Sequence, residues 1–256
     1  MSTYIVAVPT YRRERVCNEK TLATLHRHGI HKEVVFVYVA DQEQHDLYST
    51  TLNKEYYGQL IVGVKGLVQQ REFIMASFPK GQAIVFADDD LDDIYFAETS
   101  VYRGNPLHSF LESAFATSIK IGAFLWGVYP VDNPYFMKGE REYTTALRLI
   151  VGAFYGIVNR PGCADLKLVL TRDDSHKEDT ERSLQHFLKD GVVLRFDKVG
   201  IKTKYYGKIG GMGQFHERVE PSRKATERLV GVYPQYGVLK VRKNGMVEFA
   251  LKRGKK

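Results

Sequence analysis

The residues with the clearest chemical potential are three consecutive carboxylates that end a short apolar run. The run covers residues 83–87, and Asp88, Asp89 and Asp90 follow it directly. A continuous apolar run of this length is typical of a strand buried on both faces of a parallel sheet. Open α/β sheets bind ligands at the carboxyl ends of their strands. The sequence therefore predicts a candidate cation or nucleotide site at this strand end.

Two more carboxylates, Asp92 and Asp93, follow closely. Carboxylates this close repel one another unless solvent screens them or a cation lies among them. Magnesium is usually held by one or two carboxylates together with substrate phosphates. Two interpretations stay open: a metal or nucleotide site, and a solvated acidic loop.

A second set of acids lies at the start of an expected helix later in the chain. Ser175 and Glu178 have the S-x-x-E spacing of a capping box, and Gly191 is a typical helix end. If Glu178 turns back to the backbone N–H of Ser175, Asp179 lies on another side of the first turn and can face a pocket. The alternative is that these acids only complement the helix dipole.

Segment 202–216 combines glycines with lysines, among them Lys208. The pattern is typical of a mobile loop whose backbone N–H groups and cations can bind phosphates. It matches neither a P-loop nor a dinucleotide fingerprint. His216, at its end, is either a metal ligand or a solvated loop histidine.

Asp41 and Arg71 are further candidates, because both lie close to expected strand ends. Asp41 follows the second predicted strand and could bind a ribose or a base edge, or it could be a turn residue. Arg71 lies one or two turns inside a predicted helix over 66–75 and could contact a phosphate. An ion pair with Glu72 or Glu55 is the alternative for Arg71.

The elements that must position these residues alternate between strands and helices, which predicts an α/β fold. We expect strands over residues 4–8, 34–40, 58–63, 83–87 and 192–196, and helices over 18–28, 42–55, 66–75, 105–117 and 175–190. Trp126 belongs to a further strand within 119–130. In the buried segment 146–158, Gly152 and Gly156 allow close backbone approach. An Asn-Gly turn predicts a hairpin over 238–251.

The composition limits the classes of protein to which this chain can belong. The 256 residues are 44% hydrophobic and 26% charged, as in ordinary globular proteins, and no stretch is long and apolar enough for a membrane span. Because the start lacks the pattern of a secretory signal, we expect a cytoplasmic protein. Cys17 and Cys163 are too few for a disulfide scaffold. The net charge of +7 favours a polyanionic partner, although a solvated basic surface explains it equally.

In order and spacing, these parts resemble a GT-A-fold nucleotide-sugar glycosyltransferase. The resemblance spans roughly residues 4–216 and rests on five features: the first strand running into Pro9-Thr10-Tyr11-Arg12, Asp41, the helix entry from Gly66 to Arg71, the triplet Asp88-Asp89-Asp90, and the helix start Glu178-Asp179. Within that superfamily, the compact size, the basic charge and segment 177–182 resemble the phage glycosyltransferases associated with TET/JBP oxygenases. Those enzymes act on hydroxymethylated pyrimidines in DNA, and a phage-encoded protein would work in the host cytoplasm.

The resemblance implies a GT-A (Rossmann-like) domain over residues 1–216, with a mixed, mainly parallel sheet flanked by helices. A basic segment over 217–256, with the β-hairpin, would pack on the same domain. The implied activity is sugar transfer from a UDP-sugar, expected to be UDP-glucose, with Mn²⁺ or Mg²⁺ as the metal. The implied acceptor is a hydroxymethylated pyrimidine in DNA, without a membrane partner.

The resemblance also implies roles for individual residues. The expected donor-binding residues are Pro9, Thr10, Tyr11, Arg12, Asp41, Arg71, Asp88, Asp89 and Lys208. The expected metal ligands are Asp90 and His216. Asp179 would be the general base, with Glu178 beside it, which implies direct displacement with inversion at the anomeric carbon.

Other functions remain open at this point. A glycosyltransferase of the same fold could act on a glycan, a lipid or a protein. A nucleotidyltransferase would use the same strand-end acids with two metals but would not need Asp179. A basic DNA-binding module would need no acid cluster at all. If DNA is the acceptor, Trp126, Tyr205 and Tyr206 are candidates for stacking on a base. Trp126 could also stack on a sugar, and partial burial in the core is the alternative for it.

Overall fold

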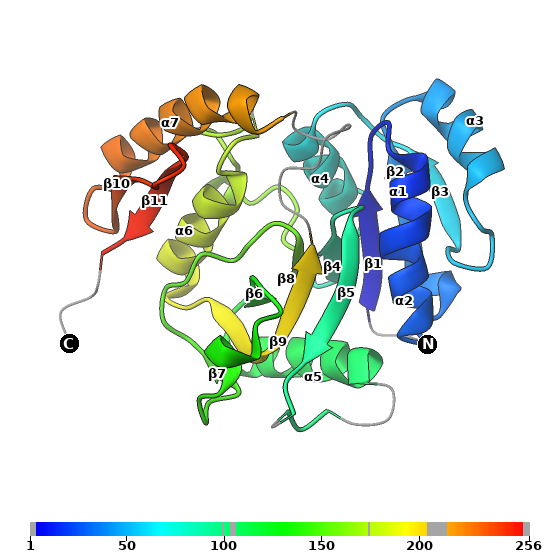
Figure 1. Ribbon diagram of the computed structural model, residues 1–256, viewed down its shortest axis with the longest axis horizontal. Coiled ribbons are helices and arrows are strands. Elements are labelled where there is room, and N and C mark those ends of the chain that lie inside the picture. Colours follow the sequence, from blue (N-terminus) through cyan, green and yellow to red (C-terminus); the bar gives the residue numbers. More distant parts are fainter. Residues whose placement is uncertain (1–3, 99, 103–105, 174, 204–213, 253–256) are drawn as a thin grey trace.

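The computed structural model describes residues 4–98, 100–102, 106–173, 175–203 and 214–252 (Figure 1). The strands are β1 (Tyr4–Pro9), β2 (Val35–Val39), β3 (Gln59–Val62), β4 (Ala83–Ala87), β5 (Leu91–Phe96), β6 (Leu125–Tyr129), β7 (Tyr143–Thr144), β8 (Phe154–Val158), β9 (Leu194–Thr203), β10 (Gly237–Val241) and β11 (Val247–Leu251). The α-helices are α1 (Glu14–Val16), α2 (Ala23–Arg27), α3 (Gln42–Thr51), α4 (Leu67–Ala76), α5 (Pro106–Ile121), α6 (Glu178–Asp190) and α7 (Phe215–Val232). The shorter helical segments are the π-helix η1 (Cys17–Leu22) and the 3₁₀ turns η2 (Lys32–Val34), η3 (Pro134–Met137) and η4 (Ala164–Leu166).

Nine of the described strands form one mixed sheet in the order β3-β2-β1-β4-β8-β6-β9-β5, with β7 paired to β9. The first four strands of this order are parallel, and β8 runs antiparallel to β4. This confirms the expected α/β class with a mixed sheet. Because β1 and β4 are parallel neighbours, the segments that follow Pro9 and Ala87 leave the sheet at the same edge.

Helices cover both faces of the sheet (Figure 1). On one face, the buried core joins strand residues such as Val6 and Val85 to Leu25 of α2 and Phe110 of α5. On the other face, a second cluster around Phe86 of β4 packs against α4 and α6. Both faces of β4 are buried, as its uninterrupted apolar run predicts.

Trp126 lies in the first of these cores. Its side chain is fully buried and makes edge-to-face contacts with Phe110 and Phe115 of α5 and with Phe196 of β9. The interpretation of Trp126 as a platform for a base or a sugar is therefore wrong. The ring packs where an aromatic side chain buries most surface.

Asp92 and Asp93 are not part of a solvated acidic loop, because both lie in strand β5. Lys20 pairs with Asp92 at 3.0 Å, and Arg27 and His28 contact Asp93 at 3.1 and 2.8 Å. These basic side chains come from the helical segment that packs beside β5. Asp92 and Asp93 thus lie along β5 and pair with this helical segment, whereas the triplet 88–90 lies at the end of β4 and is the candidate site.

The C-terminal part consists of helix α7 and the hairpin β10–β11, which lie beside α6 (Figure 1). The hairpin was predicted, whereas α7 was not. Leu229 of α7 and Phe249 of β11 are buried together with Leu184 of α6. The boundary expected between residues 216 and 217 would cut α7, because a capping box of Gln214 and Glu217 begins that helix. None of the described helices is long and apolar enough to cross a membrane.

The first prediction concerns Gly156 of β8. A Cβ at this position would lie 2.1 Å from Cε2 of the buried Trp126 ring. Gly156→Ala should therefore lower the free energy of unfolding by about 1–3 kcal/mol or more, as overpacked cores do. Urea denaturation measures the change. Gly139→Ala is the matched control, since a Cβ there meets no atom within 4 Å. Equal stabilities of the two variants would contradict the packing described for Trp126.

Candidate active site

The buried acid Asp89 ties the end of β4 to the end of β1. Its Oδ2 accepts a hydrogen bond from Oγ1 of Thr10 at 2.7 Å, and the same hydroxyl lies 2.8 Å from the hydroxyl of Tyr48. Thr10 follows β1 directly. The middle acid of the triplet therefore points into the protein, and the structure brings together Thr10 and Asp89 among the predicted site residues.

Arg13 connects this buried acid to the next one. Its guanidinium contacts Oδ1 of Asp89 at 2.8 Å and Oδ2 of Asp90 at 2.9 Å. The hydroxyl of Thr203 lies 3.2 Å from the other carboxylate oxygen of Asp90. Arg13 was not among the residues predicted for the site. Its position in the basic turn after β1 was the available signal.

The π-helix η1 fixes the backbone of the acid triplet. The hydroxyl of Thr21 donates to the carbonyl of Asp88 at 2.6 Å and accepts from the backbone N–H of Leu91 at 2.9 Å. One side chain therefore closes the turn that carries all three acids. π-Helical turns occur often at functional sites, but nothing in the sequence marked Thr21 for this role.

Arg71 of α4 links the first acid of the triplet to helix α6. Its Nη2 donates to Oδ1 of Asp88 and to the carbonyl of Gly152, both at 2.8 Å. Its Nη1 donates to Oε1 of Glu178 at 2.5 Å, and Arg182 donates to the other oxygen of Glu178. This arrangement gives the site a buried chain of alternating charges between β4 and α6.

These contacts correct two expectations. Arg71 is 97% buried, since 3% of its surface is exposed, so it neither forms a surface ion pair with Glu72 or Glu55 nor presents its Nη atoms to a phosphate. Glu178 does not cap Ser175, because two guanidinium groups hold its carboxylate. Helix α6 begins at Glu178 after Lys177, without a side-chain cap. The end of α6 at Gly191 is confirmed, with φ of 73°.

Gly152 is needed for this network. A Cβ at residue 152 would lie 2.8 Å from Oε1 of Glu178 and 3.2 Å from Nη1 of Arg71. The expected close backbone approach at Gly152 is confirmed. A larger residue would separate Arg71 from its carbonyl acceptor.

The environment shifts the pKa values of the site acids in different directions. Desolvation raises the pKa of Asp88 to about 6 despite Arg71, and burial raises the pKa of Asp89 to about 7 despite Arg13. Burial alone would raise the pKa of Glu178, but Arg182 and Arg71 hold it below its usual range. Glu178 is therefore a fixed negative charge, whereas the acids of the triplet repel one another.

Asp179 lies one residue beyond Glu178, at the start of α6. It is partly exposed, and its Oδ1 accepts from the backbone N–H of Thr180 at 2.8 Å. Desolvation and the neighbouring Glu178 carboxylate raise the pKa of Asp179 above its usual range. A carboxylate with a raised pKa is a better proton acceptor than an ordinary one.

Tyr11, Arg12 and Asp41 lie together on the other side of the triplet. Gln44 joins them, because its backbone N–H donates to Oδ1 of Asp41 at 2.9 Å and its Oε1 accepts from the backbone N–H of Arg12 at 2.8 Å. Asp41 is thus the N-cap of α3 rather than a turn residue, and it remains exposed. Lys65, which was not predicted for the site, lies 5.7 Å from the centre of the Tyr11 ring.

Among the described residues, three non-glycine residues have a positive φ, one in the segment after β1 and two directly before α6. They are Arg12, with φ of 53°, and Ser175 and Lys177, with φ of 57° and 63°. Such backbone conformations are unfavourable for residues with a Cβ and cluster at functional sites. Each of the two segments adjoins a residue predicted for the site, Tyr11 or Glu178.

Asp88 and Asp90 supply the kind of hard oxygen donors that Mg²⁺ and Mn²⁺ prefer. Within the described residues, no three His, Cys, Asp or Glu side chains are grouped to hold a metal ion. His216 lies in the first turn of α7 rather than in a loop, and it is exposed. Lys208, Tyr205 and Tyr206 lie outside the described residues, as does most of segment 202–216.

No protein-family model and no curated protein matches the sequence. The fold is similar to that of glucosyl-3-phosphoglycerate synthase from Mycobacterium tuberculosis, solved with Mn²⁺, UDP and glucosyl-3-phosphoglycerate. The TM-score is 0.54 at 12% identity, and the match covers 98% of this chain and 87% of the other.

Two further solved structures are similar. The mannosyltransferase PcManGT from Pyrobaculum calidifontis, solved with GDP-Man and Mn²⁺, has a TM-score of 0.50 at 11% identity, covering 91% of this chain and 64% of the other. S. aureus TarS (residues 1–349) has a TM-score of 0.50 at 17% identity, covering 89% and 65%. The chain thus spans less than two thirds of these two proteins. At such identities the similarity shows the fold, which is GT-A-like.

The second prediction concerns the buried charge on Arg71. Arg71→Met leaves Glu178 and Asp88 without their shared cation and should lower the free energy of unfolding by about 3–5 kcal/mol. Urea denaturation measures the change. Lys32→Met is the matched control, because Lys32 pairs with the exposed Glu55 at 3.1 Å. That variant should lose at most about 1 kcal/mol.

Adding Glu178→Gln to Arg71→Met should recover part of the lost stability, since it removes the charge of a buried carboxylate that has lost one of its two guanidinium partners. If the two substitutions are additive, Arg71 and Glu178 do not act as a pair in the folded protein.

Proposed function

We propose that the chain is a metal-dependent glycosyltransferase that uses a nucleotide-sugar donor. The observation that carries the proposal is the chain of contacts Asp88–Arg71–Glu178, which holds the start of α6 beside the acid triplet. A carboxylate pair for the donor and a separate carboxylate for the acceptor are what such a transfer requires. The similar folds of enzymes solved with UDP or GDP-Man and Mn²⁺ support the same assignment.

The donor would lie between the segment after β1 and the acid triplet. Tyr11 offers a ring face and Asp41 an exposed carboxylate for the nucleoside, here proposed to be uridine. Lys65 and Arg12 lie 5.7 and 5.2 Å from the Tyr11 ring and provide positive charge for the diphosphate. The chain's own residues thus favour an anionic ligand with a planar group.

Asp90 and Asp88 would hold the divalent metal, Mn²⁺ or Mg²⁺, which when bound neutralises charge on the diphosphate. Arg13 keeps the Asp90 carboxylate in place through one oxygen. Asp89 holds Arg13 and Thr10 and therefore acts as a positioning residue. His216 is proposed as a further ligand and Lys208 as a phosphate contact.

Asp179 is proposed as the general base. The acceptor oxygen forms a bond to the anomeric carbon while the bond from that carbon to the diphosphate oxygen breaks, and the acceptor proton passes to Asp179. UDP leaves with the electron pair of the broken bond, and the anomeric configuration inverts. Glu178 cannot share this role, because guanidinium groups occupy both of its oxygens. It positions Asp179 instead.

For the acceptor, we propose a hydroxymethylated pyrimidine in DNA and UDP-glucose as the donor. The net charge of +7 supports a polyanionic acceptor. The hairpin β10–β11 adds exposed cationic side chains, among them Lys240, Arg242 and Lys243. The burial of Trp126 removes one residue expected to stack on a base, so the argument for DNA rests on charge.

The third prediction tests the base. Asp179→Asn should leave UDP affinity within about twofold of wild type, while sugar transfer falls by about 10²–10⁴, the usual loss with a general base. Titration calorimetry with UDP and Mn²⁺ measures the affinity, and release of UDP measures turnover. Asp90→Asn should instead lose both metal-dependent UDP binding and turnover.

Asp173→Asn is the matched control, because Asp173 is an exposed acid in the segment before α6. It should change neither quantity. Unchanged transfer in Asp179→Asn would remove this residue from the mechanism. Release of pyrophosphate from a nucleoside triphosphate by the wild-type protein would favour a nucleotidyltransferase instead.

The fourth prediction tests the acceptor. Incubation with UDP-glucose and Mn²⁺ should add one hexose to DNA that contains hydroxymethylcytosine and none to unmodified DNA, as measured by nucleoside mass spectrometry. Hydrolysis of UDP-glucose without any mass shift on modified DNA would keep the transferase assignment and overturn the DNA acceptor. A glycan, lipid or protein acceptor would then be the better proposal.

A further inference from the structure

The positive charge of the chain is concentrated in its last part. Of the 37 Lys and Arg and the 30 Asp and Glu of the chain, 11 and four lie in residues 214–256, which accounts for the whole net charge of +7. Residues 1–213, which include the acid triplet and the start of α6, contain 26 basic and 26 acidic residues. Such an uneven distribution indicates a local surface for an anionic partner.

The hairpin β10–β11 holds most of this excess within the described residues. Helix α7 is nearly balanced, because it contains four basic residues and three glutamates. Residues 237–252 contain four basic residues and one acid, Glu248, and therefore have a net charge of +3. The basic residues are all exposed, and they are Lys240, Arg242, Lys243 and Lys252. Glu248 contacts Arg242, and its Oε1 lies 4.0 Å from Nζ of Lys240, so one carboxylate is shared by two cations.

The two faces of the hairpin differ in character. Lys240 and Arg242 lie on one face, since alternate residues of a strand point to the same side. Phe249 is buried on the other face, where it packs with Leu229 of α7 and Leu184 of α6. The apolar face thus fixes the hairpin to the rest of the protein, and the cationic face is open.

The hairpin lies close to Asp179, the proposed base. Lys177 connects the two, because its ammonium interacts with Asp179 in its own segment and with Glu248 and Arg242 of the hairpin. Burial lowers the pKa of Lys177, whereas Asp179 and Glu248 act in the opposite direction. The charges of Lys177 and Asp179 offset each other, so the excess stays on the hairpin. A polymer bound along the hairpin would therefore pass close to the proposed acceptor side of the site.

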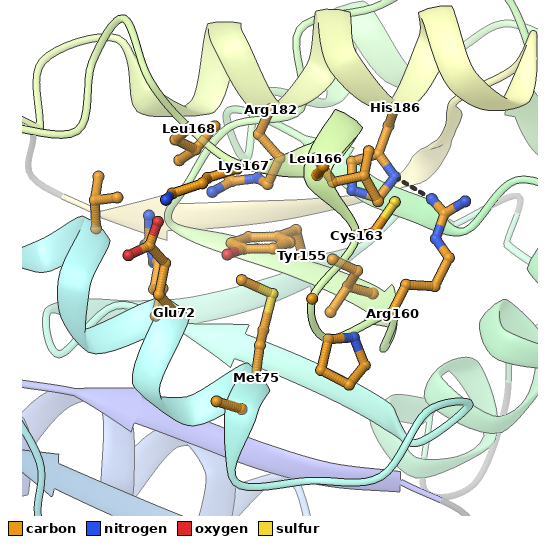
Figure 2. A pocket seen from close by; sticks show the side chains of 17 residues that line it. Glu72, Met75, Tyr155, Arg160, Cys163, Leu166, Lys167, Leu168, Arg182 and His186 are labelled. Atoms are coloured by element: carbon orange, nitrogen blue, oxygen red, sulfur yellow. Dashed lines mark hydrogen bonds between the residues drawn. The ribbon is translucent and has the colours of Figure 1, made fainter.

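The cations of the hairpin lie on an open surface rather than in a pocket. A cavity of about 440 Å³ lies elsewhere, between α4 and α6 (Figure 2). Its lining is mostly apolar and includes Met75, Tyr155 and Leu166, and no hairpin residue lines it. Cations on an open strand face suit an extended ligand with repeated negative charges better than an enclosed small molecule.

An anionic membrane fits this surface less well than a nucleic acid does. The large apolar side chains that residues 214–252 expose are three valines, Val232, Val238 and Val241. Membrane-surface segments insert larger side chains such as Trp, Phe and Leu. The hairpin therefore offers charge for phosphates but little to insert into lipid.

From the charge distribution and the position of the hairpin, we infer that the outer face of β10–β11 binds the phosphate backbone of DNA through Lys240, Arg242 and Lys243. The choice of DNA as the polyanion rests on the proposed function. The inference goes beyond that function by placing the contact on the hairpin and by making it independent of base modification, because phosphate contacts carry no sequence information.

Fluorescence anisotropy with a short labelled duplex of unmodified DNA tests the inference on the full chain, without donor or metal. The logarithm of the association constant should fall linearly with the logarithm of salt concentration between about 50 and 200 mM. The triple variant Lys240→Gln, Arg242→Gln, Lys243→Gln should bind about tenfold or more weakly. Its salt slope should be less steep by about 2–3, because each lost phosphate contact removes about 0.9.

The triple variant Lys54→Gln, Lys80→Gln, Lys120→Gln is the matched control, because it removes the same charge from exposed positions in the balanced part of the chain. Its affinity for DNA should stay within about twofold of wild type, since solvent screens distant exposed charges. The melting temperature of both variants should stay within a few degrees of wild type, because all six positions are exposed.

Three outcomes would overturn the inference: no binding of DNA by the wild type at low salt, unchanged affinity in the hairpin variant, and equal losses in the two triple variants. Binding to vesicles that contain an anionic lipid, stronger than binding to DNA and lost in the hairpin variant, would also overturn it and identify a membrane surface instead. Binding of DNA at the hairpin without hexose transfer to modified DNA would support this inference while the proposed acceptor fails.

Discussion

The arrangement of the site depends on one buried cation. Arg71 joins the carboxyl end of β4, through Asp88, to the first residue of α6, through Glu178. A guanidinium so deeply buried is tolerated only with anionic partners, so the two carboxylates and the cation constrain one another. Gly152 completes the arrangement with its carbonyl and with the space that its missing side chain leaves. Two segments far apart in the sequence are thereby held at a fixed distance, which a two-sided transfer site needs.

The three consecutive acids Asp88, Asp89 and Asp90 differ in direction and in binding partners. Successive side chains at a strand end point in alternating directions, and Asp89 points inward to Thr10 and Arg13. Asp88 and Asp90 lie on the more exposed side. Arg13 is shared between Asp89 and Asp90, so the inner acid orients the outer one. Asp89 thus has a structural reason to be acidic even if it never contacts a ligand.

Much of the fold can be predicted from the local sequence pattern, whereas much of the candidate site cannot. The apolar runs of β1, β2 and β4 and the Asn-Gly hairpin were readable because each depends on neighbouring residues alone. The spacing of Ser175 and Glu178 was equally clear but misleading, because Arg71 and Arg182 are stronger partners for a carboxylate than a backbone N–H. Arg13 and Lys65 were missed for the same reason, since their partners are distant in sequence. The residues next to a single Arg or Lys in the sequence do not indicate such a distant partner.

Strained backbone conformations occur in two segments next to the candidate site, the one after β1 and the one before α6. The left-handed conformations of Arg12, Ser175 and Lys177 persist only where surrounding contacts over-determine them. Gln44 supplies such a contact for Arg12, and the pair Arg71–Glu178 supplies it next to Lys177. Gln44 connects the segment of Arg12 to Asp41, and the segment of Lys177 leads directly into Glu178 and Asp179. The strained backbone is therefore confined to two segments that adjoin residues of the candidate site, whereas the sheet between them contains no residue with a left-handed conformation.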